Sequence, residues 1–100
     1  MNELRELKQY LKFYDEARDT EKLTAKQQRE LCKEYAQTQI YKIINISVPV
    51  ENIKFDRNRW KIICEGYGYN DKVDLVFKFY QNKCTIWDGS REINLTIENK

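Results

Sequence analysis

The side chains best suited to covalent chemistry in this sequence are three cysteines, and they stand far apart. Cys32, Cys64 and Cys84 are separated by 32 and 20 residues, so they lack the close pairs that zinc sites and redox motifs need. Histidine is absent from the sequence, which removes Ser-His-Asp and Cys-His catalysis, His-ligated metal sites and the usual near-neutral general base. We therefore expect buried, unpaired thiols, with a reactive thiol as the alternative, and no metal or cofactor.

Carboxylates are the other group that could do chemistry. Glu65, Asp71, Asp74 and Asp88 could form a paired-carboxylate or cation site, but nothing in the sequence fixes their spacing. Asp71 and Asp88 also stand where turns favour aspartate. The glycine pair in Gly66–Gly68 lacks the third glycine and the following helix of a dinucleotide-binding loop, so it indicates a turn. We predict no catalytic residue, and hence a protein that is not an enzyme.

A basic segment surrounds one tryptophan. Lys54, Arg57, Arg59 and Lys61 flank Trp60. Cations beside a stacking ring are typical of sites for single-stranded nucleic acid. The formal net charge of the chain is only +2, however, whereas nucleic-acid-binding domains usually have a strong basic excess. We rank nucleic-acid binding through these five residues as the alternative function, and a solvated hairpin edge protected by its cations as the simpler interpretation.

The elements that position these side chains can be predicted from hydrophobic periodicity. The first apolar residues, spaced three and four apart, are Leu4, Leu7, Leu11 and Tyr14. This spacing predicts an amphipathic helix over about residues 2–18, with Asn2 as its N-cap.

A second helix follows a short polar connection. Thr24 and Gln27 form a capping box, and the helical period continues from there, so we predict a helix over residues 25–44. The β-branched residues within 40–48 leave a strand as the competing prediction for that segment. Pro49 requires that the helix has ended before it.

From residue 50 onward the hydrophobic period changes from that of a helix to two, the period of strands. The runs of alternating apolar residues start at Ile53, Trp60, Val73, Cys84 and Ile93. The connections expected between them are Asp56–Asn58, Gly66–Asp71, Gln81–Asn82 and Asp88–Gly89. This pattern predicts four or five antiparallel strands between about residues 50 and 97, joined as a meander.

The fold class follows from this order of elements. We predict an α+β fold of two layers, in which the N-terminal helical hairpin packs on one face of the four- to five-stranded antiparallel meander. A length of 100 residues predicts a single domain over residues 1–100.

The opposite face of the sheet is the predicted binding surface. Strand alternation sends Ile63, Val76, Tyr80 and Trp87 to that face. Their composition is that of an interface core, and two helices cannot cover both faces of a sheet. We expect these four residues to bind a partner; the alternative is that the N-terminal segment wraps round or the sheet curls and buries Trp87.

The function predicted from these surfaces is that of a small, non-catalytic protein-binding module. Its partner would be another protein or a second copy, with a homo-oligomeric structural protein as a further alternative. The sequence is rich in four residue types with AT-rich codons, namely Ile, Lys, Asn and Tyr. This composition suggests an accessory protein of a phage or mobile element that inhibits a host defence enzyme by stoichiometric binding. A mean hydropathy of -0.83 and the charged N-terminus favour the cytoplasm and no membrane contact.

Overall fold

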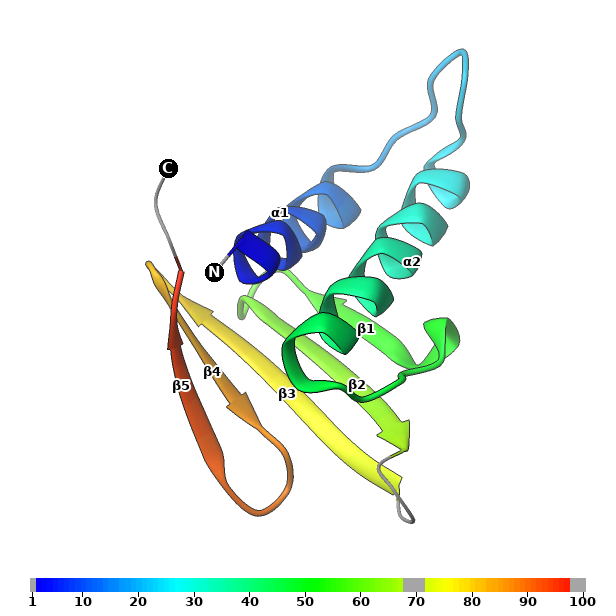
Figure 1. The fold of residues 1–100 in the computed structure, drawn as a ribbon. Coiled ribbons are helices and arrows are strands. Elements are labelled where there is room, and N and C mark those ends of the chain that lie inside the picture. The colour runs from blue at the N-terminus through cyan, green and yellow to red at the C-terminus, as the bar shows by residue number, and fades with distance from the viewer. Residues whose placement is uncertain (1, 68–71, 98–100) are drawn as a thin grey trace.

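Two helices lie on one face of a five-stranded antiparallel sheet in the computed structural model, which describes residues 2–67 and 72–97 (Figure 1). The elements are α1 (Asn2–Glu16), α2 (Ala25–Ile44), the short 3-10 helix η1 (Val50–Asn52), β1 (Ile53–Asp56), β2 (Lys61–Tyr67), β3 (Lys72–Tyr80), β4 (Lys83–Trp87) and β5 (Glu92–Thr96). The strand order β1-β2-β3-β4-β5 follows the chain. The predicted α+β meander is therefore confirmed.

The helices form where periodicity and capping place them. α1 ends at Glu16, two residues before the predicted end. The capping box of α2 is present: Thr24 Oγ1 accepts from the amide of Gln27 at 3.1 Å, and Gln27 Oε1 accepts from the amide of Thr24 at 2.9 Å. α2 continues to Ile44, where Asn45 closes it in the left-handed conformation (φ 58). The competing prediction of a strand from residue 40 is therefore wrong.

The sheet differs from prediction at two of its turns. Trp60, expected to begin a strand, lies in the β1–β2 turn with φ 53. The turn expected from Gly66 begins later, because Gly66 and Tyr67 still belong to β2. The remainder of that predicted turn, including Asp71, lies outside the described residues.

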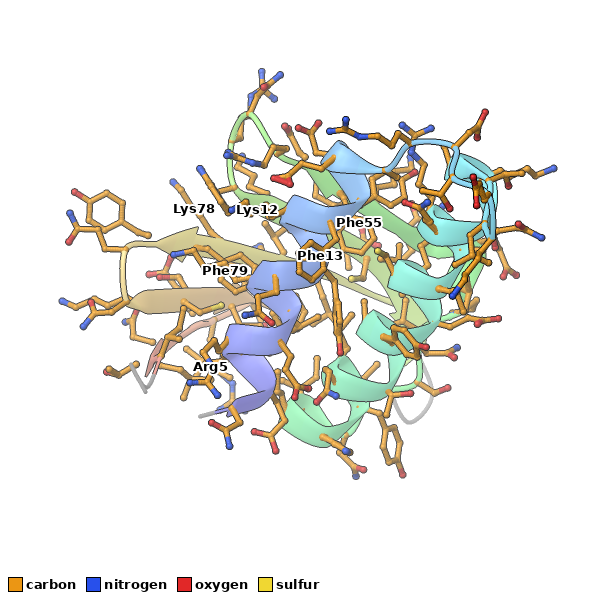
Figure 2. All side chains as sticks on the ribbon, turned by 90° about the horizontal axis from the view of Figure 1, so that it is seen from above. Arg5, Lys12, Phe13, Phe55, Lys78 and Phe79 are labelled. Carbon is orange, nitrogen blue, oxygen red and sulfur yellow. The ribbon has the colours of Figure 1, made fainter. Side chains whose placement is uncertain are left out.

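The core lies between the helices and the inner face of the sheet, by which we mean the face that the helices cover. Leu4, Leu7 and Leu11 of α1 are fully buried there, together with Phe77 of β3. Figure 2 looks onto the helices, with the sheet behind them and the β3–β4 hairpin extending past α1. The strand at the far edge from α2 is less covered, since Ile93 and Leu95 of β5 are half-buried.

Candidate protein interface on the outer sheet face

The sheet face that points away from the helices, here called the outer face, carries an apolar row across three strands. Ile63 of β2 pairs with Val76 of β3, and Val76 pairs with Trp87 of β4. Directly opposed residues on antiparallel strands have Cβ atoms about 5 Å apart, so these three side chains are neighbours. Ile63 is 38% exposed and Trp87 is 44% exposed, while Val76 between them is half-buried. We call these three residues the apolar row.

Tyr80 lies on the same face but outside the apolar row. It follows Val76 by four residues along β3, a separation of about 13 Å, and it pairs with Lys83 beside the β3–β4 turn. Tyr80 is 69% exposed. The structure thus brings together three of the four residues predicted to bind a partner and places Tyr80 at the hairpin end. The exposure of Trp87 also shows that the sheet does not curl over this side chain.

Rows of opposite charge lie on the two sides of the apolar row. On one side Glu65 of β2 is paired with Asp74 of β3, which we call the acidic row. On the other side Lys61 of β2 is paired with Lys78 of β3, which we call the basic row. Each charged row is two residues along the strands from the apolar row, or about 7 Å.

The charged rows place like charges opposite each other on β2 and β3. Like charges directly opposite each other on neighbouring strands are destabilising. Glu65 and Asp74 pair like charges, and so do Lys61 and Lys78, although Lys61 also has Asp56 directly opposite it on β1. Positions where a sequence departs from the stabilising choice are expected at functional sites. The like-charge pairs therefore make the outer face a candidate binding surface.

Sequence reasoning noted three of these charged residues separately and missed that they form rows. The signal was present as mirrored spacing around the apolar residues. Lys61, Ile63 and Glu65 follow one another at alternate positions on β2. Asp74, Val76 and Lys78 follow in the opposite charge order on β3, as antiparallel pairing requires for matching rows. The residues form rows only in the pairing register of β2 and β3, which the sequence alone does not define.

The ends of the rows reach the two sheet edges. Lys54 of β1 extends the apolar row at one edge, and Glu92 of β5 extends it at the other. Asp56 stands at the β1 end of the basic row, beside Lys61. Its carboxylate accepts from the amide of Arg59 at 3.2 Å and lies 3.9 Å from the guanidinium of Arg59. Asp56 therefore holds the β1–β2 turn, and Arg59 offsets its charge.

Trp60, the centre of the alternative nucleic-acid site, already has two cations over its ring. The guanidinium of Arg57 lies 3.9 Å from the ring centroid, and the ammonium of Lys8 on α1 lies 5.4 Å from it. The indole is half-buried and packs against the core. Stacking on a nucleobase requires an open ring face, so this geometry favours a structural role for Trp60.

The cations of the same segment point to different surfaces. Lys54 and Lys61 belong to the outer face, as their register positions show. Arg57 and Arg59 belong to the β1–β2 turn. The structure therefore divides the predicted nucleic-acid residues and does not bring them into one groove.

The three thiols are core residues. Cys32, Cys64 and Cys84 are buried and unpaired, which confirms that prediction. Burial raises the pKa of Cys64 and of Cys84 from 9.0 to about 12 and also raises the pKa of Cys32. A thiol that stays protonated at neutral pH is a poor nucleophile and a poor metal ligand.

The carboxylate of Asp88 has a structural role in the β4–β5 turn. Its Oδ1 accepts from the amide of Arg91 at 2.9 Å and from the amide of Ser90 at 3.0 Å. These amides hold the pKa of Asp88 below its ordinary value. Within residues 2–67 and 72–97, no group of three His, Cys, Asp or Glu side chains could hold a metal ion.

A hollow opens on the inner face, where α2 ends beside the β4–β5 edge. Its volume is about 240 Å³, below the range of about 300–1,000 Å³ that is typical of small-molecule sites. Its lining residues are Ile43, Ile44, Ile46, Leu75, Ile86, Asp88, Arg91 and Ile93. The guanidinium of Arg91 lies 3.7 Å from the carboxylate of Asp88. This hollow marks the part of the inner face that two helices leave incompletely covered.

In comparisons with protein-family models, curated proteins and solved structures, the chain matches none. Over the part of the chain that the structure describes, neither helix has the length and apolar character needed to cross a membrane.

Proposed function

We propose that this protein is a non-catalytic module that binds another protein chain through the outer face of its sheet. The observation that supports this proposal is the apolar row with its exposed Trp87, bordered by the acidic row and the basic row. An apolar centre with a charged rim is the arrangement expected of a protein interface, and tryptophan is enriched among the residues that dominate binding energy.

The chemistry of the side chains supports a role without catalysis. The sequence has no histidine, and burial raises the pKa of Cys64 and Cys84 to about 12, which keeps both thiols protonated near neutral pH. Three unpaired, buried cysteines also support a reducing compartment, so we propose a cytoplasmic setting.

The biological setting that we propose is an accessory protein of a phage or mobile element, with inhibition of a host defence enzyme as its use. Its support is the abundance of Ile, Lys, Asn and Tyr, whose codons are AT-rich. Stoichiometric inhibition requires a binding surface and no catalytic residue.

The test compares Trp87→Ala with Phe13→Ala, which truncates a ring that is 51% exposed on α1 (Figure 2). Tagged wild type and both variants are cross-linked in the producing cells and purified after nuclease treatment. We expect Trp87→Ala to weaken capture of the bound protein by about thirtyfold or more. The reason is that an interface tryptophan commonly contributes about 2 kcal/mol or more to the free energy of binding. Phe13→Ala should capture it as the wild type does.

A urea titration shows whether Trp87→Ala loses binding only because it is unfolded. Trp87→Ala should unfold within about 1 kcal/mol of wild type, whereas truncation of a core aromatic ring costs about 3–5 kcal/mol. Capture that is unchanged in Trp87→Ala would refute the proposal. So would a collapse of the urea midpoint, which would make Trp87 a core residue.

A further inference from the structure

We propose that the partner on the outer face is a second copy of this chain, related to the first by a two-fold axis that runs along the apolar row. This inference rests on the proposed function, because it names the occupant of the same face. It is carried by the order of the rows across β2 and β3, which is acidic, apolar and basic.

A rotation of 180° about the apolar row makes this order self-complementary. The operation places apolar row on apolar row and exchanges the two charged sides. Glu65 of each copy then faces Lys61 of the other, and Asp74 of each copy faces Lys78 of the other, since each pair shares a strand. An isologous interface therefore forms every such contact twice.

The charge pattern also excludes the other simple two-fold arrangement. An axis parallel to the strands would place the acidic row on the acidic row and the basic row on the basic row. Juxtaposed like charges at an interface suppress binding in that orientation. The axis along the apolar row leaves the strands of the two sheets nearly aligned, which is a common geometry for sheets packed face to face about 10 Å apart.

The apolar row gives this dimer its centre. Trp87 of one copy lies against Trp87 of the other, and paired aromatic rings gain affinity beyond the area that they bury. Lys54 and Glu92 would approach their own counterparts, but both stand at sheet edges, where long side chains can extend into water.

The outer face is large enough for such a contact. Five strands spaced about 4.8 Å apart, with about 20 Å of their length used, give a face of roughly 500 Å² in projection. Side-chain relief brings the accessible area toward the 800 Å² or so that each partner buries in an interface of standard size.

The test is a charge exchange between two double variants. One carries Lys61→Glu with Lys78→Glu, and the other carries Glu65→Lys with Asp74→Lys. The control, Lys22→Glu with Lys26→Glu, makes the same change of net charge as the first of these variants, on exposed residues far from the outer face. Sedimentation equilibrium measures self-association at about 0.05 M salt, where charges are weakly screened.

We expect wild type and control to dimerise equally and each outer-face variant alone to dimerise at least about tenfold more weakly. An equimolar mixture of the two outer-face variants should regain the dimer as a heterodimer, which also shows that both are folded. A wild type that is monomeric at about 100 µM, or charge variants that dimerise as it does, would overturn the inference. In that case the proposed function is still decided separately, by whether Trp87→Ala loses a captured protein of another kind.

Discussion

Lys8 of α1 donates a hydrogen bond from its Nζ to the carbonyl oxygen of Gln81 at 2.6 Å, across a sequence separation of 73 residues. The same ammonium group lies 5.4 Å from the centroid of the Trp60 ring. Gln81 and Trp60 both have φ 53, and they belong to the β3–β4 turn and the β1–β2 turn. One cation on α1 therefore contacts both turns at this end of the sheet.

We expect Lys8→Met to lower the free energy of unfolding by about 1 kcal/mol, because it removes a charged donor and a cation–π contact but keeps most of the aliphatic stem. Lys12→Met is the control. Lys12 lies one turn further along α1 and only approaches Glu16, at 4.0 Å on an exposed surface, a type of pair worth little. Urea unfolding of both variants measures the difference. Equal losses would show that the Lys8 contacts contribute nothing specific.

Thr24→Ala should destabilise the protein by about 1 kcal/mol, since Thr24 Oγ1 caps the first turn of α2. Thr38→Ala, the same change at an exposed position within α2, should have an effect near zero. Thermal unfolding monitored by circular dichroism compares the two. A Thr38→Ala variant that loses as much as Thr24→Ala would contradict the role of the cap.

Stability should fall at alkaline pH because of the buried thiols. The unfolded chain releases the protons of Cys64 and Cys84 from about pH 9, whereas the folded protein retains them to about pH 12. The folded state thus binds more protons in this window, so the free energy of unfolding decreases as pH rises. Each thiol contributes a slope of up to about 1.4 kcal/mol per pH unit.

Urea midpoints measured between about pH 8 and pH 11 test this linkage. Cys84→Ala should lower stability at neutral pH, because it leaves space in the core, but its stability should decline less steeply with pH than that of the wild type. Comparison with the wild type cancels the contribution of groups that the two proteins share. Parallel pH profiles for the two proteins would contradict the assignment.

Nucleic acid should bind weakly, in the millimolar range or below detection, near physiological salt. The reason is that Arg57 and Arg59 already interact within the β1–β2 turn, with Trp60 and Asp56 respectively. Fluorescence anisotropy with labelled single-stranded oligonucleotides measures the affinity. Submicromolar binding that is lost in Arg57→Ala with Arg59→Ala, with a steep salt dependence, would instead support the alternative site.

The sequence predicted the elements better than it predicted their assembly. The capping box at Thr24 defined the start of α2, and alternation from Ile53 onward defined a meander, because both signals are local. The prediction that Trp60 begins a strand was wrong, because Trp60 has a left-handed backbone and lies in a turn. Its ring contacts Lys8, a residue distant in sequence, and local alternation gives no sign of such a contact. The apolar row was only partly foreseen, because alternation gives the face of each residue but not its neighbours on adjacent strands.

The strand order of the sheet has a consequence for how the chain folds. Each strand pairs with the strand that precedes it, so contact order is low within the sheet, and hairpins can form one after another while the chain is being synthesised. The contact between Lys8 and Gln81 is different, because it closes a loop across 73 residues. We therefore expect α1, which leaves the ribosome well before β3 and β4, to complete its docking only after the β3–β4 turn has emerged.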